Sequence, residues 1–237
     1  MTRLGIIGSD GRMGQTVEKL AAGTFDIRAR VSADSPDFAA LSECDVVIDF
    51  SRPDALMTAL DHLGDDTRLV SGTTGLTADQ DMKVAAAATR RPVLRSGNFS
   101  VGVNLLVSLA RQSAKTLGPD WDIEILEMHH RDKADAPSGT ALMLGQAAAL
   151  GRGVALKDVM ALERDGTRMS GDIGYAVLRG GGVFGDHEVR LTNGSQMLTL
   201  GHRALNRDVF GEGAISAAQW LMDQPAGLYG MSDLLPL

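Results

Sequence analysis

The sequence predicts an α/β Rossmann-type dinucleotide-binding domain with a parallel sheet, followed by an α+β second domain with a mixed sheet. Three observations support this. Up to about residue 100, short apolar runs alternate five times with helical patterns, as in parallel α/β sheets. The first apolar run leads directly into a glycine-rich turn and then a helix. Beyond residue 100 the pattern changes to strand-like segments separated by turn residues.

Composition narrows the class of protein. The chain has 237 residues, 44% of them hydrophobic and 22% charged, which is typical of a globular protein with one or two cores. Its net charge of −7 argues against a general nucleic-acid binder. A single cysteine, Cys44, excludes an intrachain disulfide and fits a reducing compartment. Without an apolar run of membrane-spanning length or a signal-peptide core, we expect a cytoplasmic protein with no membrane or nucleic-acid partner and no metal site.

The glycine-rich turn carries the first indication of a ligand. A strand is predicted over residues 4–8, and glycines follow at positions 8, 11 and 14 before a helix over 15–22. Glycines at such a junction allow a tight turn and let the backbone approach a pyrophosphate at the helix start. Asp10 stands where the usual pattern has its middle glycine. The turn predicts dinucleotide binding, with a purely structural turn as the alternative.

The other predicted strands of this domain are also followed by polar or glycine-rich loops. Because the carboxyl ends of parallel strands share one sheet edge, these loops predict a ligand site at that edge. Ser51 is expected to cap the helix that begins near Pro53. The strands cover residues 27–31, 45–50, 69–71 and 92–95, and the loops have the sequences SRPD, GTTG and SGNFS.

The second domain is predicted to combine a few helices with a strand-rich region. Helices are expected over residues 103–117 and 140–150, with a strand over 122–128 between them. Strand-like segments then alternate up to residue 203, and Asn193-Gly194 predicts a hairpin turn. A last helix is predicted over residues 207–222.

The loop between residues 127 and 140, EMHHRDKADAPSGT, concentrates reactive side chains between a strand and a helix. His129 and His130 can titrate near neutral pH, and Lys133 is a cation that can donate a proton. Ser138-Gly139-Thr140 opens the helix with backbone N–H groups that stabilise an anion. Each feature alone is more often structural, as a packing residue or a helix cap, than functional. Together they predict a site for a small anionic substrate, with Lys133 and His129 as candidate acids.

The segment EMHHRDKADAPSGTA resembles the E-x-HH-x-x-K-x-D-A-P-S-G-T-A signature of the 4-hydroxy-tetrahydrodipicolinate reductase (dihydrodipicolinate reductase) family. The resemblance implies NAD(P)H-dependent reduction of 4-hydroxy-tetrahydrodipicolinate to tetrahydrodipicolinate with loss of water, in lysine biosynthesis through diaminopimelate. It implies His129 and Lys133 as catalytic residues. It also implies that the substrate dicarboxylate is bound by His130, Ser138, Gly139 and Thr140.

The same resemblance implies the domain boundaries and the assembly. The final helix returns to the first domain in the family, so residues 1–100 and 207–237 are expected to form the dinucleotide-binding domain. Residues 101–206 would form the domain for substrate binding and oligomerisation. The family is commonly a homotetramer built through the sheets of this second domain. Closure of the two domains is expected to bring hydride and substrate together.

The cofactor is expected to be NADPH or NADH, with dual use and a modest preference for NADPH. Ser32 stands where the family often has an acid at the end of the second strand, and Asp34 lies slightly beyond. Arg12 can attract a 2′-phosphate. The predicted cofactor-binding residues are Gly8, Ser9, Asp10, Gly11, Arg12, Met13, Ser32, Phe50, Arg52, Gly72, Thr73, Thr74, Gly97, Asn98 and Phe99.

Two other functions compete with this interpretation. Another two-domain dehydrogenase, of the aspartate or diaminopimelate type, would share the first 100 residues but lack the signature segment. A catalytically silent dinucleotide-sensing regulator would keep the fold and lose His129 or Lys133. This chain has both residues, which favours the reductase.

Overall fold

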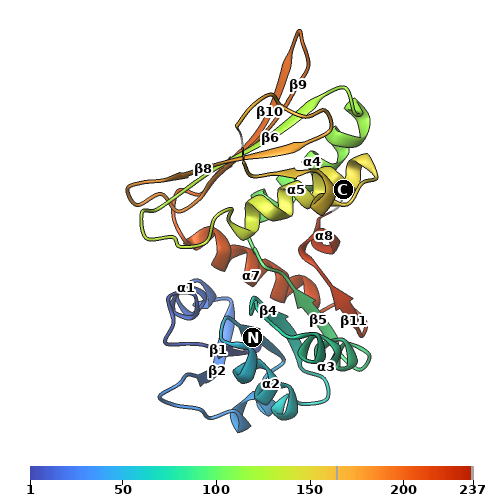
Figure 1. Cartoon of the computed structure of the whole chain (residues 1–237). Coiled ribbons are helices and arrows are strands. Elements are labelled where there is room, and N and C mark those ends of the chain that lie inside the picture. The colour runs from blue at the N-terminus through green and yellow to red at the C-terminus, as the bar shows by residue number, and fades with distance from the viewer. Residues whose placement is uncertain (164, 236–237) are drawn as a thin grey trace. The chain divides into compact units, whose positions relative to one another are not determined.

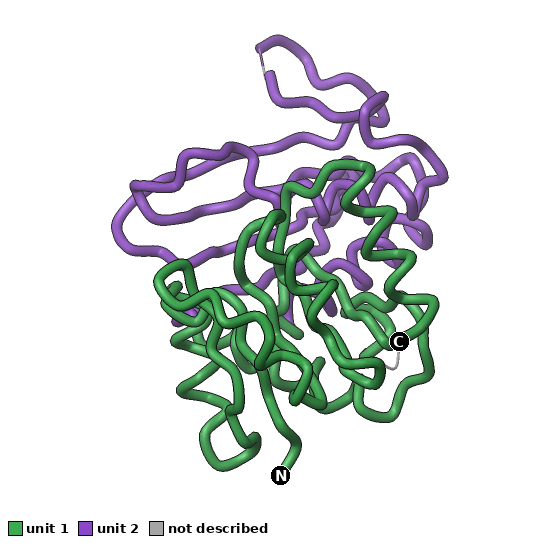
Figure 2. Tube along the Cα trace, turned by 90° about the horizontal axis from the view of Figure 1, so that it is seen from below, with its two compact units in different colours: residues 1–101, 208–237 green, residues 102–207 purple. Residues whose placement is uncertain are grey.

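The computed structural model describes residues 1–163 and 165–235, which fold into two compact units. The first unit comprises residues 1–101 and 208–237, and the second comprises residues 102–207 (Figure 2). The chain therefore leaves the first unit once, builds the second, and returns.

The first unit is built on a six-stranded sheet in which every neighbouring pair is parallel. The strand order is β11-β5-β4-β3-β1-β2, and helices separate strands that are successive in the chain (Figure 1). The expected Rossmann-type parallel sheet is confirmed, with one strand more than the five predicted. The strands are β1 (Thr2–Ile7), β2 (Phe25–Val31), β3 (Val46–Asp49), β4 (Arg68–Ser71), β5 (Pro92–Arg95) and β11 (Gly227–Tyr229).

Helices cover both faces of this sheet, because its strands are apolar on both sides. Alternate residues point to opposite faces, so Ile48 packs in one core cluster and Val47 in the other. The first cluster contains residues of α1 and α7, and the second contains residues of α2 and α3. The helices are α1 (Arg12–Ala21), η1 (Ala39–Glu43), α2 (Pro53–His62), α3 (Ala78–Ala88), α7 (Asp208–Leu221) and α8 (Met231–Leu234).

One predicted helix cap is wrong. Arg52, not Ser51, is the N-cap residue of α2, and no side chain caps that helix. The hydroxyl of Ser51 donates instead to the carboxylate of Asp49, the last residue of β3. The hydroxyl makes a stronger hydrogen bond to a carboxylate than to a neutral helix N–H, so the serine turns toward the strand.

The second unit is built on a five-stranded mixed sheet in the order β10-β9-β6-β8-β7. β6 pairs antiparallel with β9 and parallel with β8, which confirms the expected mixed sheet. The elements are α4 (Val101–Leu117), β6 (Asp122–His129), α5 (Gly139–Arg152), α6 (Leu156–Val159), β7 (Met160–Ala161), β8 (Ile173–Arg179), β9 (Asp186–Thr192) and β10 (Met197–Arg203).

In the part of the chain that the structure describes, helices α4 and α5 lie on one face of this second sheet (Figure 1). Ile123 and Ile125 of β6 pack against Leu106 of α4 and Leu144 of α5 in one buried cluster. The burial of β6 alternates strictly along the strand, as expected for a sheet with one covered face. The opposite face presents side chains such as Leu178, which is 52% exposed.

The predicted hairpin at Asn193-Gly194 joins β9 and β10, which pair antiparallel over their whole length. Residues 193–196 connect the two strands, and the backbone N–H of Asn193 donates to the carbonyl of Gln196 within this connection. The side chain of Asn193 also accepts from the N–H groups of Ser195 and Gln196. None of the described helices is long and apolar enough to cross a membrane.

Candidate active site

The glycine turn after β1 has the geometry that a pyrophosphate requires. Gly8 has a φ of +79°, and a Cβ on it would lie 2.5 Å from the carbonyl oxygen of Phe50. A Cβ on Gly14 would lie 2.1 Å from the carbonyl oxygen of Gly8, so glycine lets α1 pack onto the turn. Gly11 is the N-cap of α1, and no side chain occupies its first N–H groups. The start of α1 is therefore open to an anion.

A pocket of about 620 Å³ lies over this turn at the carboxyl ends of β1, β2 and β3. Six of the predicted cofactor residues line it: Gly8, Asp10, Gly11, Ser32, Phe50 and Arg52. Pro36, Phe38 and Thr58 also line it, and no pattern in the sequence singled them out. An apolar wall beside an open helix start suits a nucleotide.

Three predicted cofactor residues, Ser9, Arg12 and Met13, do not line this pocket. Arg12 and Met13 belong to the first turn of α1 and not to the loop, because the helix begins three residues earlier than predicted. The hydroxyl of Ser9 donates to the carbonyl of Val31 at 3.3 Å. Ser32 lines the pocket, although its hydroxyl also accepts from the N–H of Ser35.

A smaller pocket of about 350 Å³ follows β4 and β5. It contains the predicted residues Thr73, Thr74 and Gly97. Gly72 instead packs directly against the ring of Phe50. A Cβ on Gly72 would lie 2.3 Å from a ring atom, so a larger residue would displace the ring. Phe99 is buried and packs edge-on against Phe50, with ring centroids 5.3 Å apart. The side-chain oxygen of Asn98 accepts from the backbone N–H of Ser100 at 2.9 Å.

In the second unit, a buried polar cluster lies where β6 ends. We call it the Glu127 cluster, and its members are Glu127, His129, Ser138, Arg179 and His187. Glu127 accepts hydrogen bonds from three of them: from Nδ1 of His129 at 2.5 Å, from the backbone N–H of Ser138 at 3.0 Å, and from Arg179 at 2.8 and 3.0 Å. The ring of His187 lies edge-on to His129 and contacts the hydroxyl of Ser138 through Nε2 at 3.2 Å.

The electrostatics of this cluster follow from its burial. Burial opposes ionisation of Glu127, but the hydrogen bonds from Arg179, His129 and Ser138 prevail and lower its pKa. Burial lowers the pKa of His129 despite the attraction of Glu127. Burial and the neighbouring His129 lower the pKa of His187 to about 4. At neutral pH Glu127 is therefore ionised and both imidazoles are neutral, with the proton of His129 on Nδ1 facing the carboxylate.

Lys133 lies in the loop that follows β6. Its ammonium donates to both carboxylate oxygens of Asp135 at 2.7 and 2.9 Å, and that hydrogen bond lowers the pKa of Asp135. Arg179 donates to the backbone carbonyls of Lys133 and Asp135 at 3.3 and 2.6 Å. Arg179 of β8 therefore holds the backbone of this loop, and the ammonium of Lys133 lies beside the ionised carboxylate of Asp135.

The predicted carboxylate cradle is only partly available. Ser138 is buried, its N–H donates to Glu127, and its hydroxyl accepts from the N–H of Ala141 as the N-cap of α5. Gly139 and Thr140 form the first turn of α5, where backbone N–H groups point out of the helix. His130 is half-buried in the adjoining loop.

Three members of the cluster were missed by the sequence prediction as functional residues. Glu127 was noticed only as the end of a strand, and Arg179 and His187 were not considered. The position of Glu127 two residues before His129 was an available indication, because alternate residues of a strand share a face. Arg179 lies 52 residues from Glu127 in the chain, and its pairing depends on the register of β6 and β8.

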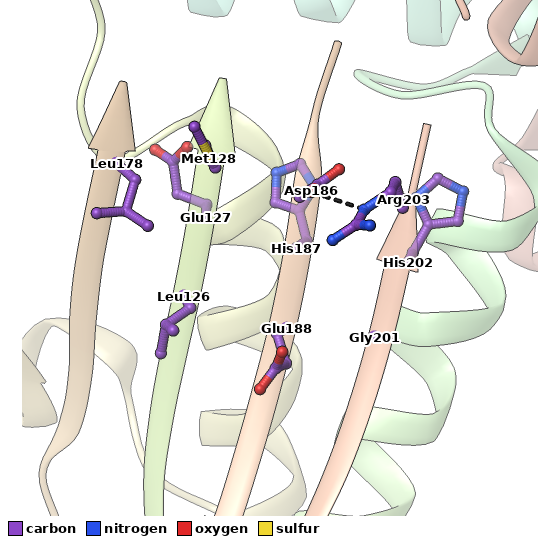
Figure 3. Close-up of a pocket in the computed structure, with 10 residues that line it drawn as sticks. All are labelled: Leu126, Glu127, Met128, Leu178, Asp186, His187, Glu188, Gly201, His202 and Arg203. Atoms are coloured by element: carbon purple, nitrogen blue, oxygen red, sulfur yellow. Dashed lines mark hydrogen bonds and ion pairs between the residues drawn. The ribbon is translucent and has the colours of Figure 1, made fainter. Parts of the chain in front are cut away.

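A third pocket, of about 420 Å³, lies on the second sheet (Figure 3). Strands β6, β8, β9 and β10 supply its lining, and Arg203 pairs with Asp186 at its edge. None of the residues predicted for catalysis or substrate binding lines this pocket. Within the described part of the chain, no group of three or more His, Cys, Asp or Glu side chains is placed to hold a metal ion.

Comparison with known families covers both halves of the chain. Residues 2–99 match the family model described as dihydrodipicolinate reductase, N-terminus, and residues 102–235 match the model for its C-terminus. The chain belongs to the dihydrodipicolinate reductase family. The family resemblance seen in the signature segment is confirmed.

Individual dihydrodipicolinate reductases agree along nearly the full length. The 4-hydroxy-tetrahydrodipicolinate reductase of Caulobacter vibrioides is 44% identical, with 98% of this chain and 96% of that protein covered. The enzyme of the same name from Zymomonas mobilis is 44% identical over 99% of this chain and 97% of its own. A dipicolinate-bound dihydrodipicolinate reductase from Paenisporosarcina sp. TG-14 has the same fold, with a TM-score of 0.79, 24% identity, and coverage of 99% and 100%.

The fold alone is shared more widely. A scyllo-inositol dehydrogenase from Lactobacillus casei superposes with a TM-score of 0.57 at 12% identity, covering 99% of this chain and 92% of its own. The two-domain architecture therefore does not separate the reductase from other dehydrogenases. The sequence matches and the signature segment make that distinction.

Proposed function

We propose that this protein reduces 4-hydroxy-tetrahydrodipicolinate to tetrahydrodipicolinate with NAD(P)H, in the diaminopimelate route to lysine. The observation that carries the proposal is that family models for both halves of the reductase match, over residues 2–99 and 102–235. In the balanced reaction one hydride and one proton are added to the substrate and one water leaves. We place the reaction in the cytoplasm, because a chain with a single cysteine suits a reducing compartment.

The first unit holds the cofactor in this proposal. Its glycine turn allows close backbone approach, the start of α1 is open to an anion, and a pocket of about 620 Å³ adjoins both. These features fit a pyrophosphate with an adenosine beside it. The loops after β4 and β5 then receive the nicotinamide through Thr73, Thr74 and Gly97. NAD(P)H supplies the hydride when it is bound.

The second unit supplies the proton, and Lys133 is the acid we propose. Its ammonium donates to the ionised Asp135, and an ammonium group has a proton to transfer. His129 suits this role less well, because it is neutral and its proton on Nδ1 faces Glu127. We assign His129 the role of a polar contact to the substrate through its other nitrogen.

One substrate carboxylate is proposed to bind at the start of α5. The backbone N–H groups of Gly139 and Thr140 begin that helix, and the positive end of its dipole favours an anion. His130 and Lys133 add polar and positive groups on the adjoining loop. Ser138 supports this site by capping α5 and joining it to Glu127.

The test is an absorbance assay at the NAD(P)H band, with the substrate generated in situ from pyruvate and aspartate semialdehyde by a synthase. We expect nucleotide oxidation that depends on the synthase, and competitive inhibition by pyridine-2,6-dicarboxylate. Thr140→Val should weaken that inhibition, since it removes a hydroxyl beside the carboxylate. No synthase-dependent oxidation with either nucleotide would rule out the proposed reaction.

For the nucleotide we propose dual use with a modest preference for NADPH. Ser32 lines the pocket as a neutral residue, and Arg12 at the start of α1 can attract a 2′-phosphate. The kcat/KM values for both nucleotides, measured with and without Arg12→Ala, test this. The substitution should lower the value for NADPH more than for NADH. Equal losses would assign Arg12 to the pyrophosphate, and a strong wild-type preference for NADH would favour Asp34 as a ribose ligand.

We further propose that the protein assembles as a homotetramer through the open face of the second sheet. That face lacks helices and exposes Leu178 and Met197, which are 52% and 57% exposed. Exposed apolar side chains on a sheet are favourable sites for association. The pocket on the same face would then be enclosed by a second copy.

A further inference from the structure

A fully buried carboxylate lies at the carboxyl end of β3, beside the proposed cofactor site. Asp49 is 0% exposed and is the last residue of that strand. β3 is flanked by β1 on one side and β4 on the other, so its end is central to the sheet edge. The loop after it, residues 50–52, lines the larger pocket, and the loop after β4 lines the smaller one.

Hydrogen bonds from both loops converge on this carboxylate. One oxygen of Asp49 accepts from the hydroxyl of Ser51 at 2.5 Å and from its backbone N–H at 3.0 Å. The other oxygen accepts from the hydroxyl of Ser71 at 2.7 Å. The N–H of Ser51 also donates to the hydroxyl of Thr73, and the N–H of Thr73 donates to Ser71. The bonds form a closed ring that joins the end of β3 to the end of β4.

Folding stability does not account for a carboxylate here. Burial raises the pKa of Asp49, and hydrogen bonds from Ser51, Ser71 and Thr73 only partly oppose this effect. An ionised group with a raised pKa lowers the stability of the folded state at neutral pH. Buried polar groups of this kind can instead specify one arrangement of the chain.

We propose that Asp49 is a positioning residue that sets the spacing between loop 50–52 and the Thr73 loop, so that one dinucleotide can occupy both pockets. The inference rests on the proposed function, because it assumes that these pockets hold the two halves of a dinucleotide. Asp49 itself is buried and acts through Ser51 and Thr73. The parts of the site proposed for adenosine and for nicotinamide are thereby kept at a fixed spacing.

A carboxylate suits this role better than an amide of the same shape. It accepts on both oxygens, from the hydroxyl and N–H of Ser51 on one and from the hydroxyl of Ser71 on the other. In Asp49→Asn the group facing Ser71 becomes an NH₂, so the hydroxyl of Ser71 has to accept from it as well as from the N–H of Thr73, and its own proton loses its acceptor. The ring of hydrogen bonds is then weaker on that side, and the two loops are held together less firmly.

The experiment compares a ligand that bridges both loops with one that occupies a single pocket. Affinities of NADPH and of ADP are measured by titration calorimetry for the wild type and for Asp49→Asn. We expect NADPH affinity to fall by about tenfold or more, as for a lost hydrogen bond to a charged group. ADP affinity should change by no more than about threefold, because ADP occupies one pocket and does not depend on the spacing between the two loops. Damage to the fold would weaken both ligands together.

Two further variants complete the test. Asp45→Asn neutralises an aspartate just before β3, at the other end of the strand, where it pairs with Arg3, and should leave both affinities unchanged. Ser71→Ala removes one donor to Asp49 and should reproduce the selective NADPH loss, even if Asp49→Asn does not fold. Unchanged NADPH affinity, or parallel losses for both ligands, overturns the inference. If the wild type binds no dinucleotide, the proposed function itself is wrong.

Discussion

At the scale of single residues, burial and pairing distinguish groups that look equivalent in the sequence. Lys133 and His129 are both candidate acids four residues apart. The structure places the lysine ammonium against Asp135 and the histidine ring against Glu127 in a buried cluster. Lys133 is a cation paired with a carboxylate, whereas burial lowers the pKa of the imidazole of His129. The proposed division of roles follows from these two environments.

Replacement of Lys133 by alanine should remove most of the turnover and leave nucleotide binding intact. Loss of a general acid typically costs roughly 10²–10⁴-fold in rate. Steady-state kcat and NADPH affinity by calorimetry measure the two effects separately. Lys157→Ala, on the exposed side of α6, is the matched control and should behave as the wild type. A Lys133→Ala variant with near-normal kcat would remove this residue from the chemistry.

The buried His187 predicts a loss of stability on acidification. Its pKa is lowered from 6.5 to about 4 in the folded chain, so the unfolded chain binds a proton first as the pH falls. The stability is present above about pH 6.5 and is lost as the pH falls toward about 4, by up to about 1.4 kcal/mol per pH unit. In His187→Gln this contribution is absent, although His129 still acts in the same direction.

Thermal unfolding midpoints, measured at several pH values across that window, provide the measurement. The wild-type midpoint should fall more steeply with decreasing pH than that of His187→Gln. The variant can be less stable at neutral pH, because the contact with Ser138 changes, so the slopes and not the absolute midpoints are compared. Parallel curves for the two proteins would show that His187 titrates normally.

At the scale of elements, one helix start organises the proposed site in each unit. α1 begins beside the glycine turn, and α5 follows an N-cap serine whose N–H and hydroxyl both serve the fold. The starts differ in their caps: α1 has no side-chain cap, whereas Ser138 caps α5. Both arrangements direct positive helix ends toward the proposed anions.

Gly14→Ala should separate α1 from the glycine turn. The added Cβ would lie 2.1 Å from a backbone carbonyl, which cannot move as a flexible side chain could. We expect a loss of about 1–3 kcal/mol in unfolding free energy and at least about tenfold weaker NADPH binding. Gly194→Ala, where a Cβ would meet no atom within 4 Å, should change neither quantity. Full NADPH affinity in Gly14→Ala would show that the turn tolerates displacement of the helix.

At the scale of the whole molecule, the chain divides its proposed tasks between two units with different sheets. The parallel sheet has helices on both faces and offers only its edge to a ligand. Among the described residues of the second unit, the helices pack on one face of the mixed sheet, and the other face is the proposed assembly surface. The proposed nucleotide site and the proposed assembly surface therefore belong to different units.

The open face predicts an assembly that a charge on it can disrupt. Light scattering coupled to size exclusion should give four times the mass of one chain. Leu178→Glu introduces a carboxylate on that face and should yield smaller species, because burying an unpaired charge is unfavourable. Leu228→Glu changes another leucine, 54% exposed on β11 of the first unit, and should leave the mass unchanged. A wild-type monomer would overturn the proposed assembly.

The sequence by itself determined the features that depend on neighbouring residues. Alternating apolar runs predicted the five longer strands of the first sheet, and residues 127–140 predicted the family. The three-residue β11 was missed, because so short a segment has no readable period and its place depends on pairing with β5.

Only the tertiary structure decided which polar groups pair. The register of β6 and β8 sets Arg179 opposite His129 and thereby brings it to Glu127, 52 residues away in the chain. Likewise, the ring of bonds at Asp49 joins two loops that follow different strands. Sequence periodicity reports which face a side chain occupies, but not its partner across the sheet. The partner is fixed by the register of strands that are distant in the chain. That register is set by the packing of the whole core, so it cannot be read from neighbouring residues.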